Sequence, residues 1–222
     1  LLRWQDISQR LTIPISDEGI LEQFEGYFDL KELDWAYYRQ QYGNIHRMDR
    51  ILKAEGKSPD DYKVAKQADA LMAFYVLDEK EIKSLLGALG YAPPEDFLRK
   101  NFDYYLRRTS HGSTLSRLVH AYLAHRLGEK QLAWQLYTEA LESDYVDIQG
   151  GTTKEGIHAG VMTGTVFFAM RAFAGLDLNG DVPTVSPNLP SHWRKMKFNL
   201  GFKGKRHHFV VGADKVRINT KG

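Results

Sequence analysis

A turn of hydroxyl, imidazole and glycine residues precedes a predicted helix in the second half of the chain. Its sequence is Thr109-Ser110-His111-Gly112-Ser113, and the helix behind it spans residues 115–127. The first amides of a helix have no intrahelical acceptor, and the helix dipole places positive charge at the same end. With serine hydroxyls and a histidine added, the turn is a predicted site for a phosphate-like anion. The alternative is an ordinary helix start, capped by Ser113 or Ser110.

A second glycine- and hydroxyl-rich loop, residues 150–156, also runs into a predicted helix. The two loops would lie at one end of a helical body if the helices between them pair antiparallel. In such a site Glu155 is a candidate general base or sugar ligand, and His158 is a candidate partner of a hydroxyl or a phosphate. The alternative for Glu155 is a cap or turn residue.

The segment Lys66-Gln67-Ala68-Asp69 carries a third candidate site. We expect it to be helical, because Ser58 is a good N-cap, Pro59 suits the first helical position, and apolar residues recur at helical spacing as far as Val76. On that helix Gln67 lies at the edge of the apolar stripe and Lys66 points away from it. Lys66 is then a solvated charge, unless both faces of the helix are covered.

Helices dominate the chain between residues 58 and 175, which predicts an all-α body. After the helix that begins at Ser58, we expect five more, over residues 79–89, 93–107, 115–127, 131–143 and 157–175. The first 57 residues have a different character, with frequent glycines and many aromatic side chains, and they predict irregular loops. Residues 182–222 alternate apolar and polar side chains and predict three or more antiparallel strands, with turns at 203–205 and 212–214.

Composition excludes several classes of protein. The 222 residues include 30 basic and 28 acidic side chains, for a formal net charge of +2. This balance gives no reason to expect a nucleic acid or an anionic membrane as partner. Cysteine is absent, which excludes disulfides and thiolate zinc sites and fits a reducing, cytoplasmic location. The sequence has no transmembrane run and no signal peptide, and the missing initiator methionine predicts a piece of a longer protein.

Five segments in order resemble glycoside hydrolase family 65, the family of maltose, trehalose, kojibiose and nigerose phosphorylases. They are residues 22–27, 66–69, 109–113, 150–158 and 187–193. The resemblance implies a mostly α fold, in which residues 1–178 are the C-terminal portion of an (α/α)6 catalytic barrel. Residues 179–222 would form a small antiparallel β domain behind it.

The activity implied by the resemblance is inverting phosphorolysis of an α-linked glucosyl disaccharide to β-glucose 1-phosphate and a sugar. Phosphate replaces the water of an inverting hydrolase and, being an anion already, needs no general base. Inorganic phosphate is the co-substrate, and no metal or other cofactor is expected. The family's general acid is a glutamate that the resemblance places upstream of Leu1, since Glu22 and Glu25 match a different stretch. The chain alone should therefore be inactive without the N-terminal part of the same protein.

The resemblance also implies roles for individual residues. The residues that would bind phosphate are Ser110, His111, Gly112 and Ser113. Those that would bind the sugar are Lys66, Gln67, Glu155 and His158. Phe24 and Tyr27 would shape the wall of the pocket, and a homodimer is a possible assembly.

Two other functions stay open. A hydrolase of the same family should carry a carboxylate in the 109–113 loop, which has none. A non-catalytic carbohydrate-binding helical domain would leave Lys66 exposed and far from that loop.

Overall fold

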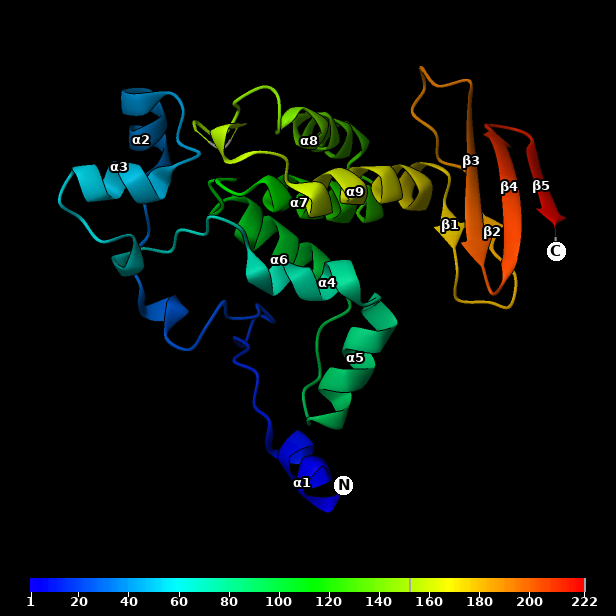
Figure 1. Cartoon of the computed structure of the whole chain (residues 1–222). Helices are drawn as coiled ribbons and strands as arrows, with labels where there is room; N and C mark the ends of the chain where they lie inside the picture. Colours follow the sequence, from blue (N-terminus) through cyan, green and yellow to red (C-terminus); the bar gives the residue numbers. More distant parts are fainter. Residues whose placement is uncertain (152, 222) are drawn as a thin grey trace. The chain divides into compact units, whose positions relative to one another are not determined.

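The computed structural model describes residues 1–151 and 153–221, so Thr152 of the second glycine-rich loop and Gly222 of the predicted β domain lie outside the described residues. The chain divides into two compact units, Leu1–Ile157 and His158–Gly222 (Figure 1). The predicted domain boundary between residues 178 and 179 stays a prediction; in the structure the last helix groups with the sheet.

The first unit is helical. Its α-helices are α1 (Leu2–Arg10), α2 (Trp35–Tyr42), α3 (Met48–Ala54), α4 (Met72–Val76), α5 (Glu79–Ala88), α6 (Phe97–Leu106), α7 (Thr114–Arg126) and α8 (Lys130–Glu142). Short 3-10 turns at Tyr27–Asp29, Pro59–Asp61, Asp69–Leu71 and Thr153–Glu155 connect them. The helices predicted over 79–89, 93–107, 115–127 and 131–143 are therefore confirmed as α5 to α8.

Helix α7 is the centre of this unit. Its side chains are buried around most of the helix, including the polar residues Ser116, Arg117 and His120. Helices α7 and α8 lie side by side, with a turn at Gly128 between them. Because the chain reverses there, the last turn of α8 returns to the end of the bundle where α7 begins.

The helix predicted from Ser58 to Val76 is wrong as far as Leu71, and only its last part is an α-helix, α4. Ser58 caps a single 3-10 turn, where its hydroxyl accepts from the Asp60 amide at 3.2 Å. The chain then runs extended, and Ala65 forms an isolated parallel bridge with Thr109. The Ala65 amide donates to the Arg108 carbonyl at 2.8 Å, so its hydrogen bond goes to a distant segment and not to a helical turn.

The expectation of irregular loops over the first 57 residues is also wrong in part, because α1, α2 and α3 lie there. Helix α2 begins at a cap, since the Asp34 carboxylate accepts from the Tyr37 amide at 3.0 Å. It ends at Gly43, whose φ is 66°. Gly43, one of the glycines that suggested loops, is thus a helix boundary.

Over its described residues, 158–221, the second unit holds one α-helix and five strands. Helix α9 (Ala159–Phe168) continues into a π-turn, Ala169–Phe173, and is followed by the short pair β1 (Leu176–Asp177) and β2 (Thr184–Val185). Strands β3 (Lys195–Phe202), β4 (Lys205–Gly212) and β5 (Val216–Lys221) form an antiparallel sheet in that order. The predicted antiparallel strands are thus confirmed.

The predicted β-turns are confirmed too. Between β3 and β4, Lys203 and Gly204 both have positive φ, 46° and 76°, as a two-residue turn between twisted strands requires. The Gly212 amide donates to the Lys215 carbonyl at 2.9 Å and closes the second turn. Phe198 and Phe209 stack on one face of the sheet with ring centroids 4.5 Å apart.

Candidate functional site

The Lys66 segment and the 109–113 turn lie side by side. Beyond the bridge between Ala65 and Thr109, the Gly112 amide donates to the Lys66 carbonyl at 3.1 Å. A Cβ at Gly112 would overlap the carbonyl oxygen of His46 and come within 3.1 Å of Lys66 Cγ. Only glycine fits this close approach to the His46 backbone, so Gly112 allows the turn to pack against the segment that carries His46.

An open cavity of about 480 Å³ lies beside these two segments. It is within the size range of small-molecule sites. The turn contributes Ser113, the neighbouring segment contributes Lys66 and Gln67, and the remaining lining residues are Gln23, Phe24, Tyr27, Leu30, Pro59, Asp60, Tyr62, Val64, Ala65 and Asp69. Lys66 is exposed, yet it lies next to the turn and not far from it. This proximity argues against the interpretation of Lys66 as an unrelated surface charge.

The predicted aromatic wall is present. Phe24 and Tyr27 both line the cavity and meet edge to face, with ring centroids 5.5 Å apart. The side chain of Gln23 connects this loop to the Lys66 segment. Its Nε2 donates to the Gln67 carbonyl at 3.2 Å, and its Oε1 accepts from the Ala70 backbone amide at 3.0 Å. The wall therefore has a defined place relative to Lys66 and Gln67.

The start of α7 is free to bind an anion. Its N-cap, Ser113, makes no side-chain capping bond, and the amides of Ser113, Thr114 and Leu115 donate to no acceptor among the described residues. Helix starts of this kind bind phosphate, sulfate and carboxylate groups. Of these three residues, Ser113 lines the cavity.

The side chains of Ser110 and His111 point elsewhere. The buried Ser110 hydroxyl lies 3.4 Å from the Ala65 carbonyl. His111 Nδ1 lies 3.0 Å from the Ser116 hydroxyl, and its ring meets the His120 ring at 4.7 Å between centroids. Burial, followed by the nearby His120 and Arg117, holds the pKa of His111 well below its usual range, so its imidazole is neutral at pH 7.

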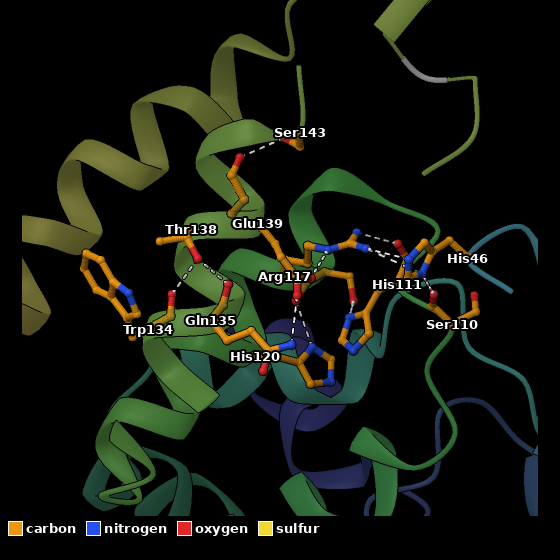
Figure 2. Close-up of polar contacts among 12 residues, drawn as sticks. His46, Ser110, His111, Arg117, His120, Trp134, Gln135, Thr138, Glu139 and Ser143 are labelled. Carbon is orange, nitrogen blue, oxygen red and sulfur yellow. Dashed lines mark hydrogen bonds and ion pairs between the residues drawn. The ribbon is translucent and has the colours of Figure 1, made fainter. Parts of the chain in front are cut away.

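A buried cation lies behind the turn (Figure 2). The Arg117 side chain is only 1% exposed, and its Nε donates to the Glu139 carboxylate of α8 at 2.7 Å. Its Nη1 donates to the His111 carbonyl at 2.8 Å, and its Nη2 lies 3.3 Å from Nε2 of His46. Sequence reasoning missed this group, although an arginine within a helix of mostly apolar neighbours was a signal that it is buried and paired.

The second glycine-rich loop approaches the same end of the first unit. Arg50 Nη1 donates to the Gly150 carbonyl at 3.4 Å, which connects the loop to α3. The Arg117–Glu139 pair places the start of α7 beside the last turn of α8, as the antiparallel expectation requires. Glu155 is exposed on its 3-10 turn, and His158 belongs to the second unit. The binding roles of Glu155 and His158 stay predictions.

Within residues 1–151 and 153–221, no group of three His, Cys, Asp or Glu side chains is placed to hold a metal ion. Over the same residues, every helix is too short or too polar to cross a membrane.

Two family models match this chain. The model described as the glycosyl hydrolase family 65 central catalytic domain matches residues 1–167. The model described as the C-terminal domain of the same family matches residues 176–222. Together they cover nearly the whole sequence, in the order that the five segments predict.

Curated relatives and a solved structure agree with the family models. The chain is 46% identical to "Trehalose 6-phosphate phosphorylase" of Lactococcus lactis subsp. lactis, over 93% of the chain and 27% of the relative. It is 28% identical to "Kojibiose phosphorylase" of Caldanaerobacter subterraneus subsp. tengcongensis, over 97% of the chain and 26% of the relative. The chain thus spans about a quarter of the length of these two relatives.

The fold likeness extends over the whole chain. A solved structure named "Putative kojibiose phosphorylase from human microbiome" is similar with a TM-score of 0.72 at 24% sequence identity. The similarity covers 100% of this chain and 30% of that structure.

Proposed function

The chain belongs to glycosyl hydrolase family 65, and on this premise we propose that it carries the phosphate- and glucosyl-binding part of an inverting disaccharide phosphorylase. The relatives named above are disaccharide phosphorylases, which supports a disaccharide and phosphate as substrates. The proposed reaction converts an α-linked glucosyl disaccharide and phosphate to β-glucose 1-phosphate and a sugar.

The proposed division of labour follows from the reaction. A phosphate oxygen attacks the anomeric carbon on the face opposite the leaving sugar, so the new bond has inverted configuration. The leaving oxygen takes its proton from a general acid outside this chain. The residues of this chain bind and aim the two reactants, and in the proposal they transfer no proton.

The observation that carries the proposal is the adjacency of the uncapped α7 start and the Lys66 segment on one cavity. Phosphate would bind the free amides and the Ser113 hydroxyl, while Lys66 and Gln67 hold the glucosyl hydroxyls. In the proposal the side chains of Ser110 and His111 do not contact phosphate. Ser110, His111 and Gly112 support phosphate binding because their backbone forms the turn that positions the start of α7. Lys66 and the α7 dipole supply positive charge for the anion.

We extend the proposal to the fold of the whole protein. Residues 1–178 would be the C-terminal portion of an (α/α)6 barrel, for which the similarity to the solved structure gives support. Because the general acid would lie outside these 222 residues, the chain expressed alone should show no phosphorolysis. Measurable activity of the isolated chain would mean that the acid lies within it.

Hydrolysis is the second candidate, because Asp60 and Asp69 also line the cavity. A hydrolase would need one such carboxylate to activate water. Asp69 already accepts a hydrogen bond from the Gln67 side chain at 2.8 Å. Sugar release that continues at full rate without phosphate would favour hydrolysis over phosphorolysis.

The decisive experiment uses the full-length protein with inorganic phosphate and a panel of disaccharides, beginning with trehalose 6-phosphate because of the 46% identical relative. Ser113→Ala should raise the KM for phosphate far more than the KM for the disaccharide, since only the anion contacts that hydroxyl. Ser84→Ala on the exposed face of α5 is the matched control and should change neither. Equal changes in both KM values would contradict the assignment.

Lys66→Ala tests the sugar half of the site in the same way. Without the Lys66 ammonium we expect slower turnover in phosphorolysis and in synthesis, because both directions share the glucosyl subsite. Lys53→Ala on α3 serves as the control for loss of an exposed lysine. A fully active Lys66→Ala variant would rule out contact with the reacting sugar.

A further inference from the structure

We propose that Arg117 is a positioning residue for phosphate, because it fixes the backbone of the 110–113 turn together with His46 and Glu139. This inference rests on the proposed function, since it takes the start of α7 as the phosphate site. Arg117 does not line the cavity and would touch neither phosphate nor sugar. Its effect would pass through the turn alone.

Each side of the Arg117 guanidinium has a partner (Figure 2). Nε donates to Glu139, Nη1 donates to the His111 carbonyl, and Nη2 faces the His46 ring. A guanidinium presents its donors in a rigid plane, so three partners at once leave it a single orientation. Because Glu139 of α8 holds the guanidinium of Arg117 in place, the bond from Arg117 fixes the position of the His111 carbonyl.

The contacts of His46 define its protonation. The Ser110 carbonyl is an acceptor 3.0 Å from His46 Nδ1, so Nδ1 carries the hydrogen and donates it. Arg117 Nη2 lies 3.3 Å from Nε2 and 3.5 Å from Nδ1, so it packs against the face of the imidazole and not along one lone pair. The Asn44 side chain accepts a hydrogen bond from the His46 backbone amide at 3.0 Å. This bond fixes the backbone position from which the imidazole extends. Neutral His46 thus holds the carbonyl next to the one that Arg117 holds.

Two successive peptide groups of the turn are oriented by these contacts. In a trans peptide the N–H points opposite to the C=O. Because the Ser110 carbonyl points toward His46 and the His111 carbonyl toward Arg117, the amides of the residues that follow point away from His46 and Arg117. The second of these amides, that of Gly112, donates to the Lys66 carbonyl. If either peptide rotated, the Gly112 amide would leave the Lys66 carbonyl, and the turn would deliver the start of α7 to a different place.

The backbone of His111 shows why a fixed constraint is needed. Its φ is 54°, in the left-handed region that residues with a Cβ seldom adopt. Such a residue keeps this conformation only where its surroundings determine it. The hydrogen bond from Arg117 to the His111 carbonyl is the charged contact at this residue, and losing it would let the turn relax to a negative φ.

The test compares two arginines of α7 in the full-length protein. Arg117→Lys keeps the charge but cannot bridge three partners, whereas Arg126→Lys alters a similar bond, from Arg126 Nη1 to the Phe74 carbonyl at 2.8 Å, at the far end of the helix. The Kd of inorganic phosphate by calorimetry, and the KM values of phosphate and disaccharide, are measured for each. We expect Arg117→Lys to weaken phosphate binding about 10- to 100-fold, as loss of a charge-assisted hydrogen bond implies. The KM of the disaccharide should be the same in Arg117→Lys as in the control variant Arg126→Lys.

The outcomes separate the two proposals. Phosphate binding by the wild-type protein with equal Kd values in Arg117→Lys and Arg126→Lys would overturn the positioning role and leave the proposed function standing. A wild-type protein that binds no phosphate would overturn both.

A second pair of variants covers the case in which Arg117→Lys does not fold. His46→Ala removes the donor to the Ser110 carbonyl, and His46→Asn restores a donor at that position. We expect weaker phosphate binding in His46→Ala and recovery in His46→Asn. Equal phosphate affinity of the alanine variant and the wild type would contradict the role of the turn's fixed carbonyls.

Discussion

Two networks of charged hydrogen bonds in the first unit have the same short distances and different surroundings. Behind the 110–113 turn, Arg117 and Glu139 are 2.7 Å apart and Arg117 is 1% exposed. On the surface of α2 and α3, Lys57 and Glu55 are also 2.7 Å apart, but Lys57 is 43% exposed. Distance alone therefore does not distinguish a network that fixes a site from one that rests on a surface.

The surface network has many contacts of its own. The Glu55 carboxylate accepts from the Tyr38 and Tyr42 hydroxyls at 2.7 Å each, and these bonds with that of Lys57 lower the pKa of Glu55 to about 2. Tyr38 is buried, but Tyr42 and Lys57 are exposed, so water competes for these two groups and the interaction is screened. The Arg117 guanidinium is buried, so water competes for it far less although Glu139 is 33% exposed, and a lost partner leaves a buried cation unpaired. Burial thus makes the difference between the two networks.

Arg117→Met should have the largest effect on stability. It leaves the His111 carbonyl and the Glu139 carboxylate without their cation, and we expect a loss of about 3 kcal/mol in the free energy of unfolding. This is the lower end of the range for broken buried pairs, because Glu139 itself is 33% exposed. Urea unfolding followed by tryptophan fluorescence measures the change. Arg126→Met is the control and should cost about 1 kcal/mol, since it loses one bond to a carbonyl. If Arg117→Met lowered the free energy of unfolding no more than Arg126→Met does, burial would not distinguish the two networks.

Acidification should have the next largest effect, through the histidines beside Arg117. Burial lowers the pKa of His120 to about 4, from about 6.5 in the unfolded chain, and its Nδ1 donates to the Ser116 carbonyl at 2.8 Å. The folded state holds His120 neutral, so its contribution to stability is complete above pH 6.5 and is lost as the pH falls toward 4. At pH 5 the loss from His120 alone should be about 2 kcal/mol.

The comparison of pH 7 with pH 5 avoids most carboxylates, which titrate at lower pH, and a His120 variant separates His120 from His111, whose pKa burial also lowers. His120→Asn keeps a donor for the Ser116 carbonyl and removes the titrating ring, so its stability should depend less on pH than that of the wild type. His208→Asn, at an exposed position on β4, should keep the wild-type pH dependence. Equal pH dependence of all three proteins would show that water reaches His120.

The elements that local chemistry determines could be predicted from the sequence. Helix α5 is an example, because Asp78 and Glu81 form a capping box at its start and Gly90, with φ of 87°, follows its end. The turn at Lys203 and Gly204 is another. The 109–113 turn was recognised from its residue types before a helix, and its adjacency to Lys66 followed only from the family resemblance.

The elements that distant contacts determine could not be predicted. Apolar residues after Ser58 recur at helical spacing, but the backbone of Ala65 pairs with Arg108 and Ser110, which no periodicity reveals. Likewise, the sequence shows His46 and Glu139 far from Arg117, and only folding brings them together. The direction of the His111 side chain, toward Ser116, was inaccessible for the same reason.

Lys57→Met should have the smallest effect of all and makes the comparison sharpest. Its bond to Glu55 equals that of Arg117 to Glu139 in length, yet Lys57 is 43% exposed to solvent. We expect an unfolding midpoint within the scatter of replicate wild-type measurements, and no change in the affinity for phosphate. Raising NaCl to about 1 M, which shortens the screening length to about 3 Å, should leave the Arg117→Met difference in place and erase any remaining Lys57→Met difference. A Lys57→Met loss as large as that of Arg117→Met would mean that the α2–α3 surface is covered in the full-length protein, and that both networks are buried there.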